Sequence, residues 1–254
     1  MYFAVNPWPK GTTERLLSSL QALREQAQAP LYSYILLDAS FDQSLPIAFS
    51  WRRYVECTLY DDTRLAGLKA VAPHLLRMPD ESEKQLAWLN ELASSCSGKP
   101  MLSLLCSAVP AQALIAHFRP YLLARTEDSL EWPVRWADTR VLPILIDSLT
   151  PAERTHFMAP IHAWSCLDRS GEILEWSGDG LPNPAPPDFD CWPLDDARFS
   201  HLVAEAEADA IIGALHDTHP DLFDELESAM AHAIVKNSLP LANLYGLESA
   251  GSRQ

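Results

Sequence analysis

Apolar and polar residues alternate between two patterns along the first two thirds of the chain. Apolar runs of strand length lie at residues 31–37, 55–60, 74–78, 101–106 and 132–136. Apolar residues that recur every three or four positions, as on one face of a helix, lie at residues 12–27, 65–72, 82–95 and 110–124. Strands that alternate with helices in this way predict an α/β layered lobe with a mixed sheet.

Two local signals mark element boundaries in this part of the chain. Thr150 and Glu153 have the spacing of a capping box, and Pro151 stands at the first helical position, so a helix is predicted to begin here. Residues 161–167 and 172–176 are strand-like and flank a short Arg-Ser-Gly turn. This arrangement predicts a hairpin of two antiparallel strands.

The last part of the chain has helical spacing. Apolar residues predict one amphipathic helix over 199–210 and a second over 222–233, with Thr218–Asp221 as the start of the second. Both helices have acidic outer faces and together predict a helical hairpin. The expected architecture is therefore an N-terminal α/β lobe followed by a smaller helical lobe.

Charge supports the same division. The 254 residues carry a formal net charge of −15, but residues 1–171 hold 16 basic and 18 acidic side chains, whereas residues 172–254 hold 3 and 16. The two parts thus differ sharply, with net charges of −2 and −13. A stretch rich in proline, glycine and aspartate lies at the junction. We therefore divide the chain into an α/β lobe (1–177), a linker or loop (178–194) and an acidic helical lobe (195–254).

Composition excludes some classes of function and favours one compartment. A chain this acidic is a poor partner for nucleic acid or an anionic membrane. Its start lacks a basic segment followed by an apolar one, so no secretory signal is expected. Five cysteines without paired spacing predict free thiols in a reducing cytoplasm. Glycine-rich phosphate loops and the nucleophile elbow of hydrolases are missing from the sequence, so no cofactor and no enzymatic activity are expected.

Two groups of residues are candidates for metal sites. His156, His162 and Cys166 lie close in sequence, and His216 and His219 are three residues apart. Zinc sites usually have tighter, paired spacings, so we interpret both groups as structural or surface residues and expect no metal. The carboxylate pairs of the chain fall in predicted turns and helix starts, where Asp is favoured for capping rather than for acid–base chemistry.

The aromatic residues suggest a binding surface. Trp192 lies beside Phe189 in the proline-rich stretch and is the tryptophan most expected to be exposed. Exposed aromatics on an irregular segment are typical of protein interfaces, whereas the alternative is that Trp192 covers the junction between the lobes. Acidic residues of the helical lobe, namely Asp221, Asp224 and Glu225, complete the predicted partner-binding set.

One segment resembles a known family. It contains Arg135, Trp136, Asp138 and Arg140, then the helix start at Thr150, then the run Phe157–Ile161 that includes Pro160, and it ends at Trp164. The strand that ends at Asp38 and the segment 71–76 add to the match, which covers about residues 31–165. This arrangement resembles the adaptors of type VI secretion, also called effector chaperones, a domain-of-unknown-function family. Thr139 and Ala159 replace the proline and glycine usual in that pattern.

The resemblance implies a cytoplasmic adaptor that binds a secreted effector protein and helps to load it onto a spike-tip protein. From the residues themselves we expect a structural role for the shared segment. Asp138 would cap a helix, Arg135 and Arg140 would pair with Asp138 or with Asp38, and Phe157 and Trp164 would pack that helix onto the sheet.

Two alternatives remain open at this stage. The protein could be a small hydrolase with a site of Asp, His and Arg residues, which a deep pocket lined by Asp38, Arg135, Asp138 and Arg140 would favour. It could also be an immunity protein whose acidic surface neutralises a toxin, a reading that the net charge fits.

Overall fold

A large antiparallel sheet forms the centre of the molecule. The computed structural model describes residues 2–27, 29–50 and 55–247, and within these residues six strands pair in the order β2-β3-β1-β4-β7-β8. All five pairings between these described strands are antiparallel. The strands are β1 (Tyr32–Asp38), β2 (Val55–Thr58), β3 (Pro73–Arg77), β4 (Leu102–Ser107), β7 (Ile161–Leu167) and β8 (Ile173–Ser177).

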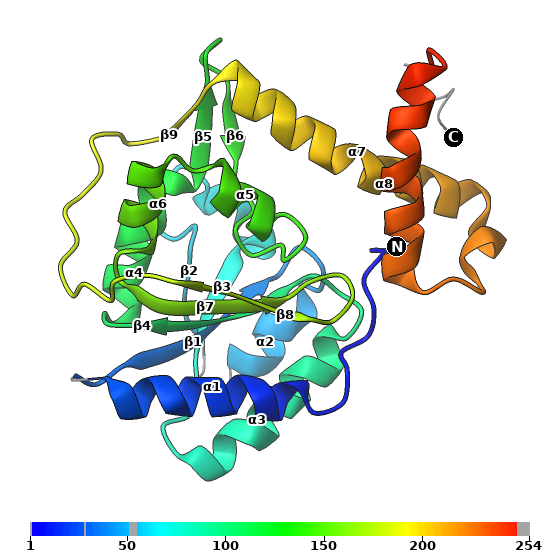
Figure 1. The fold of residues 1–254 in the computed structure, drawn as a ribbon. Coiled ribbons are helices and arrows are strands. Elements are labelled where there is room, and N and C mark those ends of the chain that lie inside the picture. The colour runs from blue at the N-terminus through cyan, green and yellow to red at the C-terminus, as the bar shows by residue number, and fades with distance from the viewer. Residues whose placement is uncertain (1, 28, 51–54, 248–254) are drawn as a thin grey trace.

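Helices cover both faces of this sheet, as Figure 1 shows. On β1, Ile35 and Leu37 belong to one hydrophobic cluster, and Tyr34 and Leu36 belong to another on the opposite face. Because β1 is buried on both faces, its sequence is a continuous apolar run and does not alternate. One face packs against α1 (Thr12–Gln26) and α3 (Ser82–Cys96), the other against α4 (Ala111–Phe118), α5 (Leu142–Ser148) and α6 (Pro151–Met158).

A second, smaller sheet explains why one predicted helix was too long. The helix expected over 110–124 ends at Phe118, and Arg119–Tyr121 forms a 3₁₀ turn (η2) around Pro120, which cannot donate a helical hydrogen bond. The chain then enters a three-stranded sheet, in which β5 pairs with β6 antiparallel and with β9 parallel. Its strands are β5 (Leu123–Thr126), β6 (Glu131–Pro133) and β9 (Trp192–Leu194).

The predicted α/β class is confirmed, and within the described residues parallel pairing is found between β5 and β9 alone. The capping box is also confirmed: Thr150 Oγ1 accepts from the Glu153 backbone N–H, and the Glu153 carboxylate accepts from the Thr150 N–H. The hairpin is confirmed by the pairing of β7 with β8. The remaining described elements of this part are α2 (Ser44–Ser50) and the 3₁₀ segment η1 (Ala66–Val71).

Helices follow the small sheet. α7 (Asp196–Thr218) begins at Asp195, whose side chain caps it by accepting from the Arg198 N–H. The second predicted helix start is wrong: Pro220–Phe223 forms a single 3₁₀ turn (η3), Glu227 is extended, and α8 runs from Ser228 to Leu244. In the view of Figure 1, α7 crosses the top of the molecule and α8 stands upright at its side.

The N-terminal segment, residues 2–9, connects the two ends of the chain. The Tyr2 ring stacks on His216 with 5.0 Å between centroids and contacts Phe223. Asn6 Oδ1 accepts a 3.0 Å hydrogen bond from the Ala229 N–H, so Asn6 caps the first turn of α8 from outside the helix. The C-terminal helices therefore contact the first residues of the chain as well as one another.

Candidate functional site

A cluster of paired arginines and aspartates lies at the end of β1, and two of its aspartates, Asp38 and Asp138, are buried. Asp38 ends β1, whereas Arg135 and Asp138 lie in the connection between β6 and α5. Arg135 Nη2 is 2.9 Å from Asp38 Oδ2, and its Nη1 is 3.3 Å from Asp138 Oδ2. Arg135 thus joins the end of the central strand to the loop, and the predicted pairing of these residues is confirmed.

Asp138 is the centre of the cluster. Its side chain is fully buried, and it accepts from both Nε (3.1 Å) and Nη2 (2.8 Å) of Arg140 in a two-pronged pairing. Asp138 also accepts from the Arg140 backbone N–H, which closes a turn. The predicted helix cap is therefore displaced: Asp138 stabilises the turn, and α5 begins four residues later at Leu142.

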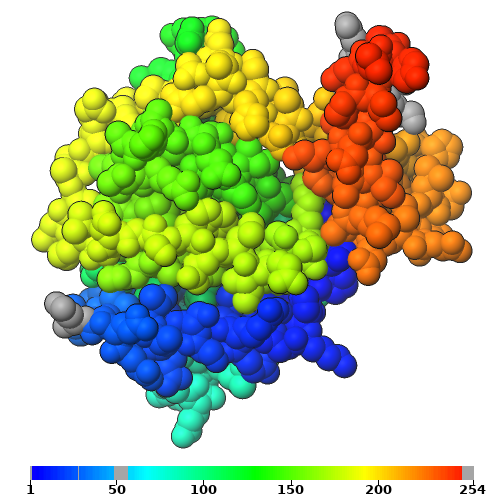
Figure 2. Space-filling view, viewed as in Figure 1, coloured from blue at the N-terminus to red at the C-terminus, as the bar shows by residue number. Residues whose placement is uncertain are grey.

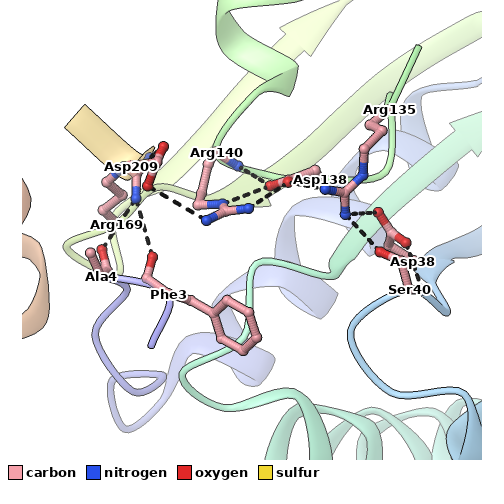
Figure 3. A network of polar contacts seen from close by, with 9 residues as sticks. All are labelled: Phe3, Ala4, Asp38, Ser40, Arg135, Asp138, Arg140, Arg169 and Asp209. Atoms are coloured by element: carbon pink, nitrogen blue, oxygen red, sulfur yellow. Dashed lines mark hydrogen bonds and ion pairs between the residues drawn. The ribbon is translucent and has the colours of Figure 1, made fainter. Parts of the chain in front are cut away.

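The same cluster reaches α7, as Figure 3 shows. Arg140 Nη1 lies 3.5 Å from Asp209 Oδ1, and Arg169 Nη2 lies 2.6 Å from Asp209 Oδ2. Arg169, in the β7–β8 turn, also donates to the carbonyls of Phe3 and Ala4. Three arginines and three aspartates therefore form one alternating chain of charges among the residues described, which extends from β1 to α7.

Burial and pairing act in opposite directions on these arginines. Burial lowers the pKa of Arg169 despite its pairing with Asp209. For Arg140, burial also opposes the charged form, but the hydrogen bonds and charge of Asp138 prevail and raise its pKa. The charges are thus matched within the protein, which is the condition under which buried ions are tolerated.

A cavity of about 850 Å³ opens beside this cluster. Asp38, Arg135 and Arg140 line it, whereas the fully buried Asp138 does not. Its lining also includes aromatic residues and residues of α7, among them Tyr2, Phe3, Phe41, Tyr60, Asp209 and His216. Phe41 stacks under Arg135, whose Cζ is 4.8 Å from the ring centroid. Because Asp38 and Asp209 already pair with arginines, the geometry is that of a structural ion-pair chain at the edge of a cavity.

The apolar signature residues are confirmed as core. Phe157 and Trp164 are fully buried, with 5.9 Å between their ring centroids, and so α6 packs onto β7 as predicted. Trp164 Nε1 donates to Ser103 Oγ at 2.9 Å. The Pro160 carbonyl accepts from Ser107 Oγ at 2.8 Å, which fixes the chain before β7 to the end of β4.

The predicted exposure of Trp192 is wrong. Pairing of β9 with β5 turns its ring inward, where it is fully buried and lies 5.8 Å from Trp136. Its Nε1 donates to Glu153 Oε1 at 3.1 Å. Phe189 is half-buried against Tyr121, with 5.2 Å between the ring centroids. The alternative interpretation, in which Trp192 closes a junction in the core, fits the structure.

A different tryptophan, Trp132, is exposed, and the sequence pattern did not predict this. Trp132 on β6 is 46% exposed, and its ring lies 5.7 Å from that of Phe199 on α7. Trp132 lies in the run 132–136 that was predicted as a strand, and a strand of three residues at the edge of a small sheet leaves one face uncovered. Nothing in the periodicity of so short a run could have distinguished this case from a core strand.

The acidic residues chosen as partner contacts lie together. Asp221 belongs to η3, and Asp224 and Glu225 follow it in the turn before α8. All three are exposed, and two exposed leucines, Leu222 and Leu226, alternate with them. Their role in binding a partner stays a prediction.

His156 and His216 of the two candidate metal groups have other partners. His156 Nδ1 hydrogen-bonds to the Tyr121 hydroxyl and its Nε2 to the Ala185 carbonyl, while Cys166 is buried in the core. His216 stacks on Tyr2. Within the described part of the chain, no group of three or more His, Cys, Asp or Glu residues is placed to hold a metal ion.

The described helices contain no segment that combines the length and the apolar character needed to cross a bilayer. No curated protein and no solved structure matches the chain. One family model does match, over residues 33–156, which is just under half of the chain and contains Asp38, Arg135, Asp138 and Arg140. The chain is thus similar, over that segment, to the family described as domain of unknown function DUF4123.

Proposed function

We propose that this protein is a cytoplasmic adaptor that binds a secreted effector of a type VI secretion system and helps to load it onto the spike-tip protein. The observation that carries the proposal is that two matches fall on the same part of the chain. The family match over residues 33–156 falls within the segment that resembles effector chaperones. That segment holds four members of the arginine–aspartate cluster, namely Asp38, Arg135, Asp138 and Arg140, and the capping box.

The chemistry of the matched segment supports a scaffold. Its buried aspartates pair with arginines and several of its aromatic residues, such as Tyr121 and Trp136, pack in the core, so these groups stabilise the fold. The same chain of charges attaches α7 through Asp209, which comes from outside the matched segment. In our proposal, the α/β part holds the C-terminal helices in place, and these helices contact the effector.

Surface charge supports this assignment. Residues 172–254 carry 16 acidic and 3 basic side chains, and exposed acids gather between α7 and α8. A concentration of one sign of charge accelerates and orients the binding of an oppositely charged partner. We therefore propose that the effector presents a basic patch to the C-terminal helices, and that their association weakens as salt rises.

Co-purification with the products of neighbouring genes tests the proposal. The tagged protein is expressed with each neighbour, and the captured partner is quantified at low and at high salt. The triple variant D221N/D224N/E225Q should reduce the amount captured at low salt. The control D80N/E81Q/E83Q removes three exposed acids from the start of α3 and should leave capture unchanged. Absence of capture by the unmodified protein at low salt would refute the adaptor proposal.

A second candidate function rests on the cavity beside the cluster. Three of the four residues named for a hydrolase line it, namely Asp38, Arg135 and Arg140. The ion pairs of Asp38 and Asp209 weigh against acid–base chemistry there, because both carboxylates are already engaged in the contacts that hold the fold together. Hydrolysis of a general ester or phosphoester panel, lost in the R135K variant, would favour the enzyme over the adaptor.

A toxicity assay distinguishes an immunity protein from an adaptor. Cells that express the neighbouring toxin would survive if this chain neutralised it, whereas an adaptor need not protect them. Survival without any transfer of the toxin to the spike would favour the immunity function.

A further inference from the structure

Helix α8 has two apolar faces. One packs against the protein, and the other is exposed. Its inner face packs on α7, with Ala231 buried and Val235 half-buried. A helix that rests on a protein surface normally has a charged or polar outer face. In α8 that outer face is apolar: Met230 is 52% exposed, Ile234 49%, Leu241 58% and Leu244 78%.

The outer residues follow the spacing of a helix that pairs with another helix. Positions 230, 234, 237, 241 and 244 are separated by four and three residues in turn, which places them in one stripe. Asn237 is the polar position of this stripe. A single polar residue in such a seam is the usual means of fixing register between two paired helices. We call these five residues the α8 stripe.

Charge is almost excluded from this helix. From Ser228 to Leu244 the sequence has one charged side chain, Lys236, and its ammonium is 2.6 Å from the Glu205 carboxylate on α7. In Figures 1 and 2, α8 is the red column at the side of the molecule, and Figure 2 shows it forming part of the visible surface. An exposed apolar stripe of this kind marks a surface for interaction.

Acidic residues lie at one end of the stripe. Asp221, Asp224, Glu225 and Glu227 are all exposed and directly precede α8. The surface is therefore apolar along the helix and negative where the helix begins. A matching partner is apolar along one face and basic at one end or along its flanks.

We infer that the α8 stripe binds an amphipathic helix that carries lysine or arginine beside its apolar face. This inference rests on the proposed function, in which the helix belongs to the effector, and it specifies the surface and the chemistry of the contact. A second copy of this chain is the less favoured occupant. Two copies would bring together molecules of charge −15 each, with acidic turns next to both stripes.

Binding of synthetic peptides to the full-length protein tests the inference. The probe is a fluorescent helical peptide about three heptads long. Leucines at alternating spacings of three and four residues give it one apolar face, and lysines occupy the positions that flank this face. One control peptide has the same composition in an order that breaks the stripe, and a second has glutamate in place of lysine. Fluorescence anisotropy should show binding of the lysine peptide and at least roughly tenfold weaker binding of both controls.

Matched variants locate the binding surface. I234S/L241S removes two exposed side chains of the stripe, and L130S/L181S removes two similarly exposed leucines elsewhere. The first should weaken lysine-peptide binding roughly tenfold, while the second should leave it unchanged. Thermal melts followed by circular dichroism verify that both variants fold.

Three results would overturn the inference. In the first, I234S/L241S binds the lysine peptide as tightly as the unmodified protein. In the second, no peptide binds. In the third, the unmodified protein is a dimer in solution that I234S/L241S separates, which would assign the stripe to a second copy.

Effector capture separates this inference from the proposed function. If I234S/L241S still captures the neighbouring effector in full, the stripe is not the contact and the adaptor function stands. If the stripe binds the lysine peptide but the unmodified protein captures no effector, the adaptor function fails and the docking surface stands.

Discussion

Arg169 and Asp209, which are 40 residues apart in sequence, form a 2.6 Å ion pair that joins the β7–β8 turn to the middle of α7. Asp209 is also within 3.5 Å of Arg140, so one carboxylate faces two arginines that are largely buried. Asp209 thus adds a charged attachment for the C-terminal helices to the apolar packing of Phe199 and Leu202 against the core.

Replacing Asp209 by asparagine should destabilise the protein. Removal of one member of a buried ion pair costs about 3–5 kcal/mol, and the low end applies because Asp209 is a quarter exposed. Urea unfolding measures the loss, and hydrogen exchange should show it concentrated in α7 and α8. D217N, on an exposed position of the same helix, is the control. Equal losses in the two variants would show that Asp209 has no special role.

The pairing of Arg135 with Asp38 should be visible as non-additivity. R135A leaves the buried Asp38 without the cation that the structure gives it, so we expect a loss of about 3 kcal/mol. Adding D38N removes the unpaired charge, and the double variant should recover about 1 kcal/mol or more relative to the sum of the single variants. Urea unfolding of all four proteins gives the coupling energy. Simple additivity would contradict a direct interaction.

Stability should fall as the pH falls from about 6.5 to about 4, through His117. Burial lowers the pKa of His117 from 6.5 to about 4, and the nearby His156 adds to the effect. The unfolded chain therefore takes up the proton first, and stability that is complete above pH 6.5 is lost toward pH 4.

Thermal melting at half-unit pH intervals measures this dependence. H117Q should be less stable at neutral pH and should have a flatter profile between pH 6.5 and 4 than the unmodified protein. Asp42 provides an internal reference, since hydrogen bonds from Ser44 and Lys99 lower its pKa to about 2 and place its contribution at more acidic pH. An unchanged profile in H117Q would assign the dependence to other groups.

Asn237 should limit self-association through the α8 stripe. Replacing it by leucine makes the stripe continuously apolar and removes the polar group that disfavours unspecific pairing. N237L should therefore form dimers or larger species at high salt, where the repulsion between acidic molecules is screened. Light scattering coupled to size exclusion measures the mass, and N243L, near the end of the same helix, is the comparison. A monomeric N237L at all salt concentrations would contradict the pairing geometry.

Local patterns predicted most of the central α/β architecture. The capping box at Thr150, the hairpin that follows it and the buried run of β1 depend on neighbouring residues, and each is present as expected. The pairing of Arg135 and Arg140 with Asp138 was also anticipated, because the two arginines flank that aspartate closely in sequence, and pairing with Asp38 was the stated alternative. The local features could be predicted since their causes lie within a few residues of one another.

Features that depend on distant partners were predicted poorly. The burial of Trp192 results from the pairing of β9 with β5, about 70 residues earlier in the chain, and no local pattern encodes it. The later start of α8 follows from the 3₁₀ turn at Pro220–Phe223. The helical spacing of apolar residues continues through this turn, but the backbone is not α-helical there until Ser228. Asp209 did carry a signal, because it interrupts the inner face of α7 between Leu202 and His216.

Because α7 directly follows a strand of the small sheet, a small rotation at that strand would move the far end of the helix by a larger distance. β9 ends one residue before Asp195 caps the helix, so the strand leads directly into α7. With 23 residues α7 is about 35 Å long, and a rotation of about 10° at β9 would displace its far end by about 6 Å. The ion pairs of Asp209 hold α7 in place roughly 20 Å from its start. A partner that draws Asp209 away from its arginines would thereby convert a change of an ångström at the cluster into a larger movement of α8.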